Sequence, residues 1–242
     1  MFDHITLRVA DVVDAGSAIT AVLGELEIEQ SSRTASFAVW GNFALTQAEN
    51  EHPIARRVHI GFIAPTRAHV DRFSEAGVHV GFADDGAAGP RPDYAADYYA
   101  AFLKDGAGNS FEAVYRDGAR PRGNVDHVVI RVRDLEASAA FYSTIGPAAG
   151  LTLRRRTADR AAFAVGASDG SLSVVAGDPT QNVHLAFSGH DEDVRRFHAE
   201  ATAGGYRSNG EPGERPRYHQ GYYAAYVLDP DGNNIEIVDH HR

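Results

Sequence analysis

Apolar residues recur at every second position in several short segments of the chain, a period typical of β-strands with one buried face. The segment 4–9 has this pattern, and the segment 127–132 repeats it. In both segments the opposite face begins with a histidine, His4 or His127. We therefore expect two equivalent strands, each with one apolar face and one face that carries a histidine.

Helical periods and further apolar runs follow each of these strands. Asp134 can cap a helix that begins at Leu135 and that Gly146-Pro147 would end. A second amphipathic helix is expected over Asp191–Ala203, where Gly204-Gly205 stops it. Short β-rich runs complete the pattern at 163–165, 172–175, 183–187, 222–228 and 234–238. The order of elements in this half of the chain is βαβββ, twice.

The second half of the chain repeats the first half 123 to 125 residues later. Asp3-His4-Ile5 lines up with Asp126-His127-Val128, and Tyr98-Tyr99-Ala100-Ala101 lines up with Tyr222-Tyr223-Ala224-Ala225. The polar stretch 116–124 contains Gly and Pro without an apolar period, so we place the joint at about residue 120. The sequence predicts an α+β fold of two modules, residues 1–118 and 124–242, each built from two βαβββ units.

Charge and composition narrow the possible functions. The chain has 242 residues, a formal net charge of −10 and no cysteine. An acidic chain without a basic stripe argues against nucleic-acid binding, and the lack of cysteine excludes disulfides and thiolate metal sites. No apolar run reaches the roughly 20 residues of a membrane span, and the first residues read as a strand, not a signal peptide. We expect a cytoplasmic protein, monomeric or homo-oligomeric, that acts on a small molecule.

Two histidine pairs and one glutamate pair recur in both halves, among 12 histidines in all. The recurring set is His4 with His127, His59 with His184, and Glu112 with Glu236. Two imidazoles and one carboxylate can hold a divalent ion and leave positions open for a substrate. The same residues could instead be structural histidines and a solvent-facing glutamate, because a duplication copies structural residues equally well.

The tail segment from Tyr222 to Glu236 is the most specific motif. Together with the recurring histidines, it resembles the vicinal oxygen chelate superfamily, which includes glyoxalases, fosfomycin-resistance proteins and extradiol dioxygenases. The resemblance covers both halves and implies βαβββ units curled into two cup-shaped modules, each with a metal ion inside. It also implies that the ligands group by module, into His4, His59 and Glu112 in one site and His127, His184 and Glu236 in the other.

Departures from the family's patterns distinguish its members. Glyoxalase I-like members use a fourth protein ligand, usually Glu, on the last strand of the first βαβββ unit. The corresponding runs 40–45 and 172–175 contain no carboxylate, which argues against glyoxalase I. Bleomycin-binding members lack the metal ligands that this chain has, which argues against a module that only sequesters a drug.

Extradiol dioxygenases have a His and a Tyr that contact the substrate's hydroxyl oxygens, and His219 and Tyr226 match these positions. The first half has Ala95 and Phe102 instead, so the second half is better equipped for this reaction. Two features depart from the dioxygenase pattern: Ala225 replaces a bulky apolar residue, and no histidine lies just before position 184.

The leading prediction is a metal-dependent enzyme of this superfamily, with a ring-cleaving dioxygenase as the first choice and a lyase, isomerase or resistance transferase as alternatives. Fe(II) or Mn(II) is the expected metal, with Zn, Ni or Mg also possible. The candidate catalytic residues are His219 and Tyr226, and the candidate substrate-binding residues are Arg8, Arg131, Tyr99, Tyr222 and Tyr223. Two other hypotheses remain: a binding or resistance protein whose cup only sequesters a ligand, and a chain in which the first module is a structural remnant.

Overall fold

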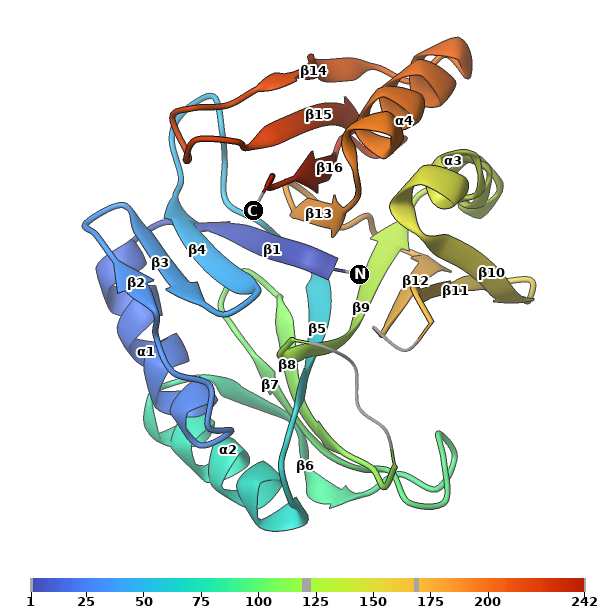
Figure 1. Cartoon of the computed structure of the whole chain (residues 1–242). Coiled ribbons are helices and arrows are strands. Elements are labelled where there is room, and N and C mark those ends of the chain that lie inside the picture. Colours follow the sequence, from blue (N-terminus) through green and yellow to red (C-terminus); the bar gives the residue numbers. More distant parts are fainter. Residues whose placement is uncertain (1, 119–122, 168–169, 242) are drawn as a thin grey trace.

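A computed structural model describes residues 2–118, 123–167 and 170–241 of the chain (Figure 1). The expected joint at about residue 120 lies outside the described residues. The first half contains β1 (Phe2–Val9), α1 (Val12–Gly24), β2 (Ser32–Arg33), β3 (Phe37–Trp40), β4 (Phe43–Gln47), β5 (Val58–Ile63), α2 (Arg67–His79), β6 (Ala83–Pro90), β7 (Tyr99–Lys104) and β8 (Ser110–Tyr115). The second half contains β9 (Val125–Val132), α3 (Leu135–Ala149), β10 (Leu151–Arg156), β11 (Arg160–Val165), β12 (Ser171–Ala176), β13 (His184–Ser188), α4 (Asp191–Ala203), β14 (Ser208–Glu214), β15 (Tyr223–Leu228) and β16 (Asn234–Asp239).

The strands form two mixed sheets of eight, and each sheet takes half of its strands from each half of the chain. The order in one sheet is β14-β15-β16-β13-β1-β4-β3-β2, and the order in the other is β10-β11-β12-β9-β5-β8-β7-β6. The link between the halves is antiparallel in both sheets, through β1 with β13 and β5 with β9. The α+β class and the tandem βαβββ units are therefore confirmed, but a sheet is not built from one copy of the repeat alone.

The helices lie on the outside of the sheets, as Figure 1 shows, with α1 beside α2 and α3 beside α4. One continuous core runs under them and between the two sheets. At its centre the Phe43 ring of β4 meets the Phe62 ring of β5 edge-on, with 5.3 Å between centroids. The apolar faces that the alternation predicted are these buried faces, and they leave the histidine faces of the strands on the concave sides.

The helix ends depart from the prediction in one place. The predicted helix 191–203 is α4, but α3 does not stop at Gly146-Pro147 and continues to Ala149. A proline in the final turn removes a single N–H bond, and the helix ends one turn later at Gly150, whose φ of 65° suits glycine. No helix among the described residues is long and apolar enough to cross a membrane.

Candidate metal centres

Three neighbouring strands of the first sheet bring together His4, His184 and Glu236, which we call site 1. His4 of β1 and Glu236 of β16 both stand beside Ala186 of β13, and His184 lies two residues earlier on that strand. Residues two apart on a strand share a face, so all three side chains point into the same cup. Their ligand atoms converge, with 3.1 Å between the two imidazole Nε2 atoms and 2.8 Å from His184 Nε2 to Glu236 Oε2.

The second sheet repeats this arrangement with His59, His127 and Glu112, which we call site 2. Both His127 of β9 and Glu112 of β8 stand beside Gly61 of β5, two residues after His59. The two Nε2 atoms are 3.0 Å apart, and Glu112 Oε2 lies 2.9 Å from His59 and 3.2 Å from His127. A Cβ atom on Gly61 would lie 2.3 Å from His127 Cε1, so glycine is what lets the imidazole lie over this strand.

The predicted grouping of the ligands by module is wrong. Each site takes one histidine from one half of the chain and a histidine and a glutamate from the other half. The cause is the pairing of the sheets: β1 lies beside β13 and not beside β5. The alternation of residues fixes which face of a strand His4 occupies, but it does not fix which strand lies next to it.

The Nδ1 atoms of the four histidines face away from the ligand cluster, and each of them also makes a hydrogen bond. One histidine of each site hydrogen-bonds through Nδ1 to the aspartate that precedes it, His4 to Asp3 at 2.8 Å and His127 to Asp126 at 2.9 Å. The other histidines are held by Asn234 and Ser110: His184 Nδ1 lies 2.7 Å from the Asn234 amide, and His59 Nδ1 lies 3.0 Å from the Ser110 hydroxyl. Such outer contacts fix ring orientation and are usual around metal-binding histidines.

A tyrosine hydroxyl donates to the glutamate of each site. Tyr222 donates to Glu236 Oε1 and Tyr98 donates to Glu112 Oε1, both at 2.7 Å. Burial and the charge of the neighbouring glutamate raise the pKa of both tyrosines, so they remain protonated donors. In each glutamate one oxygen is therefore fixed and the other, Oε2, faces the imidazoles.

At both sites the pKa of one histidine is raised and the pKa of the other is lowered. Burial opposes the charge on His127, but its bonds to Asp126 and Glu112 outweigh burial and raise its pKa to about 9. The pKa of His4 is raised for the same reason, against burial, by Asp3 and Glu236. Burial lowers the pKa of His59 and His184 despite the nearby glutamates, and the other histidine of each site adds to the lowering.

The glutamates are anionic in spite of their burial. Burial alone would raise the pKa of Glu112, but the hydrogen bonds and charges of His127 and His59 lower it to about 2. Burial opposes ionisation of Glu236 as well, and its contacts with His184, His4 and Tyr222 lower its pKa. Each site thus holds a buried carboxylate together with one imidazole whose pKa is raised and one whose pKa is lowered.

The donor set fits a divalent cation. Two ligand atoms that lie about 2.1 Å from a metal ion and at right angles to each other are about 3.0 Å apart. The separations at site 2 are 2.9, 3.0 and 3.2 Å, and those at site 1 are 2.8, 3.1 and 3.6 Å. A pair of imidazole nitrogens that face each other also needs a cation or a shared proton between them. The glutamates are almost fully buried, whereas His4 retains 26% and His59 22% of side-chain exposure, so each cup is open on the imidazole side.

Tyr226 lies beside site 1 with its hydroxyl buried. Its ring centroid is 6.3 Å from that of His184, and it stands beside Glu236 in the sheet. The hydroxyl has no hydrogen-bond partner among the described residues. Burial and the charge of Glu236 raise the pKa of Tyr226, so the group carries a proton that it can donate. Phe102 occupies the matching place at site 2, 6.0 Å from His59, without a hydroxyl.

Arg8 and Arg131, the predicted substrate-binding arginines, lie close enough to a histidine of each site to affect its pKa. Burial is the largest cause of the lowered pKa of His184, and the charge of Arg8 is a smaller one. Arg131 has the same smaller effect on the pKa of His59. Arg8 is half-buried, and burial lowers its own pKa against the charges of Glu49 and Tyr218. Among the described residues no ion pair or side-chain hydrogen bond engages the Arg8 guanidinium within bonding distance.

His219 does not contact the ligands of site 1 directly. Its Nε2 is 2.9 Å from His240 Nδ1, and His240 Nε2 is 2.9 Å from Asp3 Oδ2. Asp3 in turn holds His4. His219 is therefore joined to the ligand His4 by a chain of hydrogen bonds through two other side chains, and its ring packs against Tyr222 at 5.3 Å.

Tyr99 and Tyr223 do not lie in the cups, against the prediction. Tyr99 donates a hydrogen bond of 2.7 Å to Asp71 of α2, and Tyr223 accepts one of 3.1 Å from Arg195 of α4. Neighbouring residues on a strand point to opposite faces, so the cup takes only one tyrosine of each pair. Tyr222 is one of these, but its hydroxyl is engaged by Glu236. Tyr98 is the other, and the sequence hypothesis omitted it although the repeat aligns it with Tyr222.

Several other residues of the sites were not predicted. Asp3 and Asp126 stand out in the repeat, because each directly precedes a recurring histidine, and that signal could have found them. Their further partners differ: Asp126 pairs with Arg116, whereas Asp3 accepts hydrogen bonds from Ser188 and His240. His240 aligns with Arg116 in the first half and not with another histidine, so the repeat does not mark it as a recurring residue.

Comparisons with known proteins agree with the fold and with the resemblance. Residues 124–237 match the family described as Glyoxalase/Bleomycin resistance protein/Dioxygenase superfamily. Glyoxalase I from Zea mays is 18% identical, with a TM-score of 0.70 over 99% of this chain and 92% of that chain. A Bacillus subtilis protein with a provisional dioxygenase assignment is 15% identical, with a TM-score of 0.68 over 98% and 84% of the two chains. A search of the curated proteins finds no match.

These findings define the class of protein. The second half of the chain is a vicinal oxygen chelate module by sequence, and the whole chain has the two-module fold of glyoxalase I. The predicted resemblance is therefore confirmed by sequence for residues 124–237 and by fold for the whole chain. The superfamily includes metal-dependent enzymes, and this chain has two groups of candidate metal ligands.

Proposed function

We propose that this protein is a divalent-metal-dependent enzyme that acts on a small molecule with two adjacent oxygen atoms, and that the reaction takes place at site 1. One observation carries the proposal: at site 1 the ligand atoms of His4, His184 and Glu236 converge beside the buried hydroxyl of Tyr226, which lies near Glu236 but makes no well-formed hydrogen bond among the described residues. A buried hydroxyl without a partner costs free energy, so a group that it can bind belongs there.

The residues of site 1 have separable roles. A divalent ion held by the three ligands would supply a Lewis acid for the two substrate oxygens. Tyr226 donates a hydrogen bond to a substrate oxygen, and its raised pKa keeps the proton in place. Arg8 offers its positive charge to an anionic group of the substrate. Tyr222 is a positioning residue, because it acts through Glu236.

Within this class, ring cleavage of a catechol by dioxygen is the first choice. Three protein ligands leave room for a chelating substrate and a further small molecule. The strands β4 and β12 contain no carboxylate that could add a fourth ligand. Tyr226 and His219 stand at the sequence positions that match the residues contacting substrate in extradiol dioxygenases; Tyr226 lies beside site 1, whereas His219 reaches His4 only through His240 and Asp3. Fe(II) is the metal that suits this reaction, and Mn(II) is the alternative.

A lyase or isomerase is the second choice, and the likeness of the fold to glyoxalase I favours it. In such a reaction a bound metal ion would again supply the Lewis acid, and Tyr226 would donate a hydrogen bond to the substrate oxygen that becomes negatively charged. A third possibility is a protein that binds a small molecule without turning it over. In that case, removal of the metal would leave ligand affinity intact.

The test is an oxygen-uptake measurement on protein reconstituted anaerobically with Fe(II), Mn(II) or Zn(II), with a panel of substituted catechols. Ring cleavage consumes one dioxygen per catechol, and both oxygen atoms enter the product, so uptake and the absorbance of the ring-opened product should rise together. A parallel assay with a hemithioacetal tests the isomerase. Metal binding without turnover in either assay would favour the binding protein, and no metal uptake at all would contradict the enzyme proposal.

A further inference from the structure

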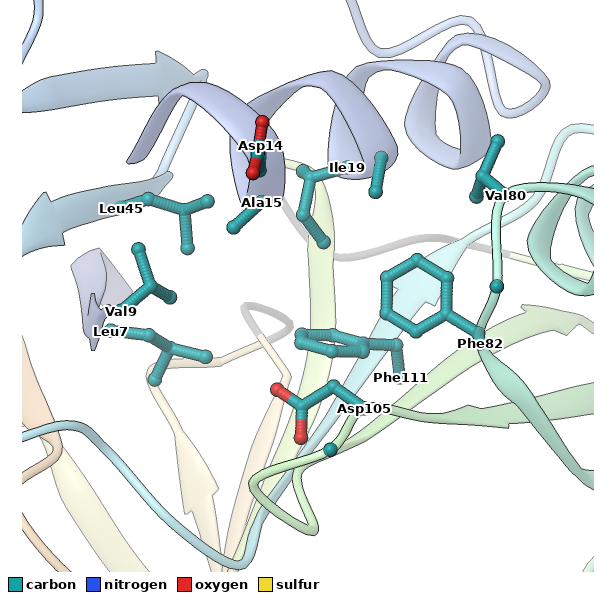
Figure 2. Close-up of a pocket in the computed structure, with 13 residues that line it drawn as sticks. Leu7, Val9, Asp14, Ala15, Ile19, Leu45, Val80, Phe82, Asp105 and Phe111 are labelled. Carbon is teal, nitrogen blue, oxygen red and sulfur yellow. The ribbon is translucent and has the colours of Figure 1, made fainter. Parts of the chain in front are cut away.

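A cavity of about 270 Å³ lies behind β1, on the side of the sheet away from site 1 (Figure 2). Leu7 and Val9 face it from β1, whereas His4 points from the opposite face of this strand into the cup. Helix α1 forms another wall, with Ala18 and Ile19. The cavity is therefore separate from both candidate metal centres.

The same place in the other half of the molecule is filled. Helix α3 matches α1 by its capping aspartate, Asp134 against Asp11, so that Phe141 and Tyr142 stand where α1 has Ala18 and Ile19. The Phe141 ring packs edge-on against Tyr206 at 4.8 Å. Two aromatic side chains thus occupy the volume that α1 leaves open, because alanine and isoleucine are much smaller.

The polar end of the cavity is the turn between β7 and β8, where Asp105 matches Asp229 of the turn between β15 and β16. Asp105 Oδ1 accepts from the backbone of Ala107 and Asn109, and Oδ2 accepts from the Asn109 side chain at 2.9 Å. Asp229 has the same set of bonds from Asp231 and Asn233.

Asp229 also has one bond that Asp105 lacks. The hydroxyl of Tyr142 donates to Asp229 Oδ2 at 3.1 Å, deep in the structure. Ile19 cannot make this bond, and apart from Asn109 no described side chain donates to Asp105 Oδ2. Figure 2 shows the Asp105 carboxylate beside the Phe111 ring, across the cavity from Ala15 and Ile19.

We propose that this cavity binds a small phenol, whose ring takes the place of the Tyr142 side chain and whose hydroxyl donates to Asp105. The ligand class is inferred from Tyr142, which fills the equivalent place in the second half of the chain, because a tyrosine side chain is itself a substituted phenol. A dry cavity of about 150 Å³ is enough for benzene, so this volume accommodates one substituted ring.

The charge and exposure of the residues that line the cavity favour a ligand that is neutral and donates a hydrogen bond. Asp14, which is exposed, and Asp105, which is half-buried, are the ionisable residues that line the cavity. Burial raises the pKa of Asp105 in spite of its bonds from Asn109, Ala107 and Gly108, so an added donor would be favourable there. Two carboxylates with apolar walls disfavour an anionic ligand.

The probes are p-cresol, which has the structure of a tyrosine side chain, and toluene, which lacks the hydroxyl. Binding to the metal-loaded protein is measured by calorimetry. We expect p-cresol to bind about fivefold more tightly than toluene, which is the usual effect of one added hydrogen bond. The variant Ile19→Tyr places the missing side chain in the cavity and should weaken the binding of both probes at least about tenfold while raising the Tm.

Two controls separate this site from the cups and from a loss of folding. Ser17→Tyr adds a tyrosine on the exposed side of α1 and should leave binding unchanged. Glu236→Gln alters site 1 and should also leave p-cresol binding unchanged. Failure of p-cresol to bind the native protein, equal affinity for the two probes, or undiminished binding to a folded Ile19→Tyr variant would each overturn the proposal.

Discussion

Site 1 and site 2 have the same three ligand types at the same places on equivalent strands, yet their surroundings differ. Tyr226 lies beside site 1, where site 2 has Phe102. The aspartate behind site 1 is joined to a chain of two further histidines, whereas the one behind site 2 pairs with Arg116. Under the proposed function, both sites would bind a metal ion but only site 1 would carry the reaction, because the side chains outside the three ligands differ between the sites.

The strongest test of this difference is to remove one histidine from each site. His184→Ala should reduce turnover to the uncatalysed background, because site 1 loses its ligand. His59→Ala, the matched change at site 2, should retain most of the turnover. Steady-state rates of the two Fe(II)-loaded variants check this, and equal losses would contradict the assignment of the reaction to site 1.

The hydroxyl of Tyr226 should account for much of the difference between the sites. Tyr226→Phe makes site 1 like site 2 in this respect, and kcat should fall by about 10²- to 10³-fold, as for the loss of one oxyanion donor. Metal content should not change. The reciprocal variant Phe102→Tyr serves as the control, since it adds a hydroxyl at site 2. A kcat for Tyr226→Phe within twofold of the native value would remove Tyr226 from the mechanism.

The metal-free protein should lose stability as pH rises. The raised pKa of His127 means that its contribution is complete below pH 6.5 and is lost as pH rises to about 9. The lost free energy of unfolding is about 3 kcal/mol. The lowered pKa of Glu112 acts at the other end, where stability is lost as pH falls from 4.5 to about 2.

Urea unfolding in the presence of a chelator measures this dependence. His127→Gln should flatten the loss between pH 6.5 and 9, although a contribution from His4 will remain, because its pKa is also raised. A stability that is independent of pH over this interval in the native apoprotein would show that His127 is not protonated in the folded state.

The smallest effect is expected from the tyrosines that hold the glutamates. Tyr222→Phe and Tyr98→Phe should each weaken metal binding at their own site by about 10- to 100-fold, because each frees one oxygen of a buried carboxylate. Competition titration with a chelating dye measures both affinities. The two losses should be similar, since both hydrogen bonds are 2.7 Å long; a loss at only one site would mean that the likeness between the sites does not extend to their outer contacts.

The sequence predicted the residues that come together in the two candidate sites better than it predicted how the strands pair. The repeat separated His4, His59, His127 and His184 from the other histidines, and period-two alternation placed them on the polar faces of strands. It could not reveal which strands are neighbours, because pairing depends on contacts between segments that are far apart in the sequence, such as His4 and His184, which are 180 residues apart.

Other features were missed for local reasons. The strands β6 and β14, Ala83–Pro90 and Ser208–Glu214, are rich in Gly, Pro and acidic residues, so they give no β signal and owe their conformation to their neighbours in the sheet. The choice between Tyr98 and Tyr99 depends on the register of β7, and a shift of one residue reverses which side chain enters the cup.

The central claim is that each site is assembled from both halves of the chain, and double variants test it most directly. Metal content per chain is measured by elemental mass spectrometry after saturation and removal of free metal. His4→Ala combined with Glu236→Ala removes two ligands of one site, so about one of two equivalents should remain. His4→Ala combined with Glu112→Ala damages both sites, and almost no metal should remain. The reverse result, with one equivalent retained by the second pair and none by the first, would mean that the ligands group within each half and would contradict the account.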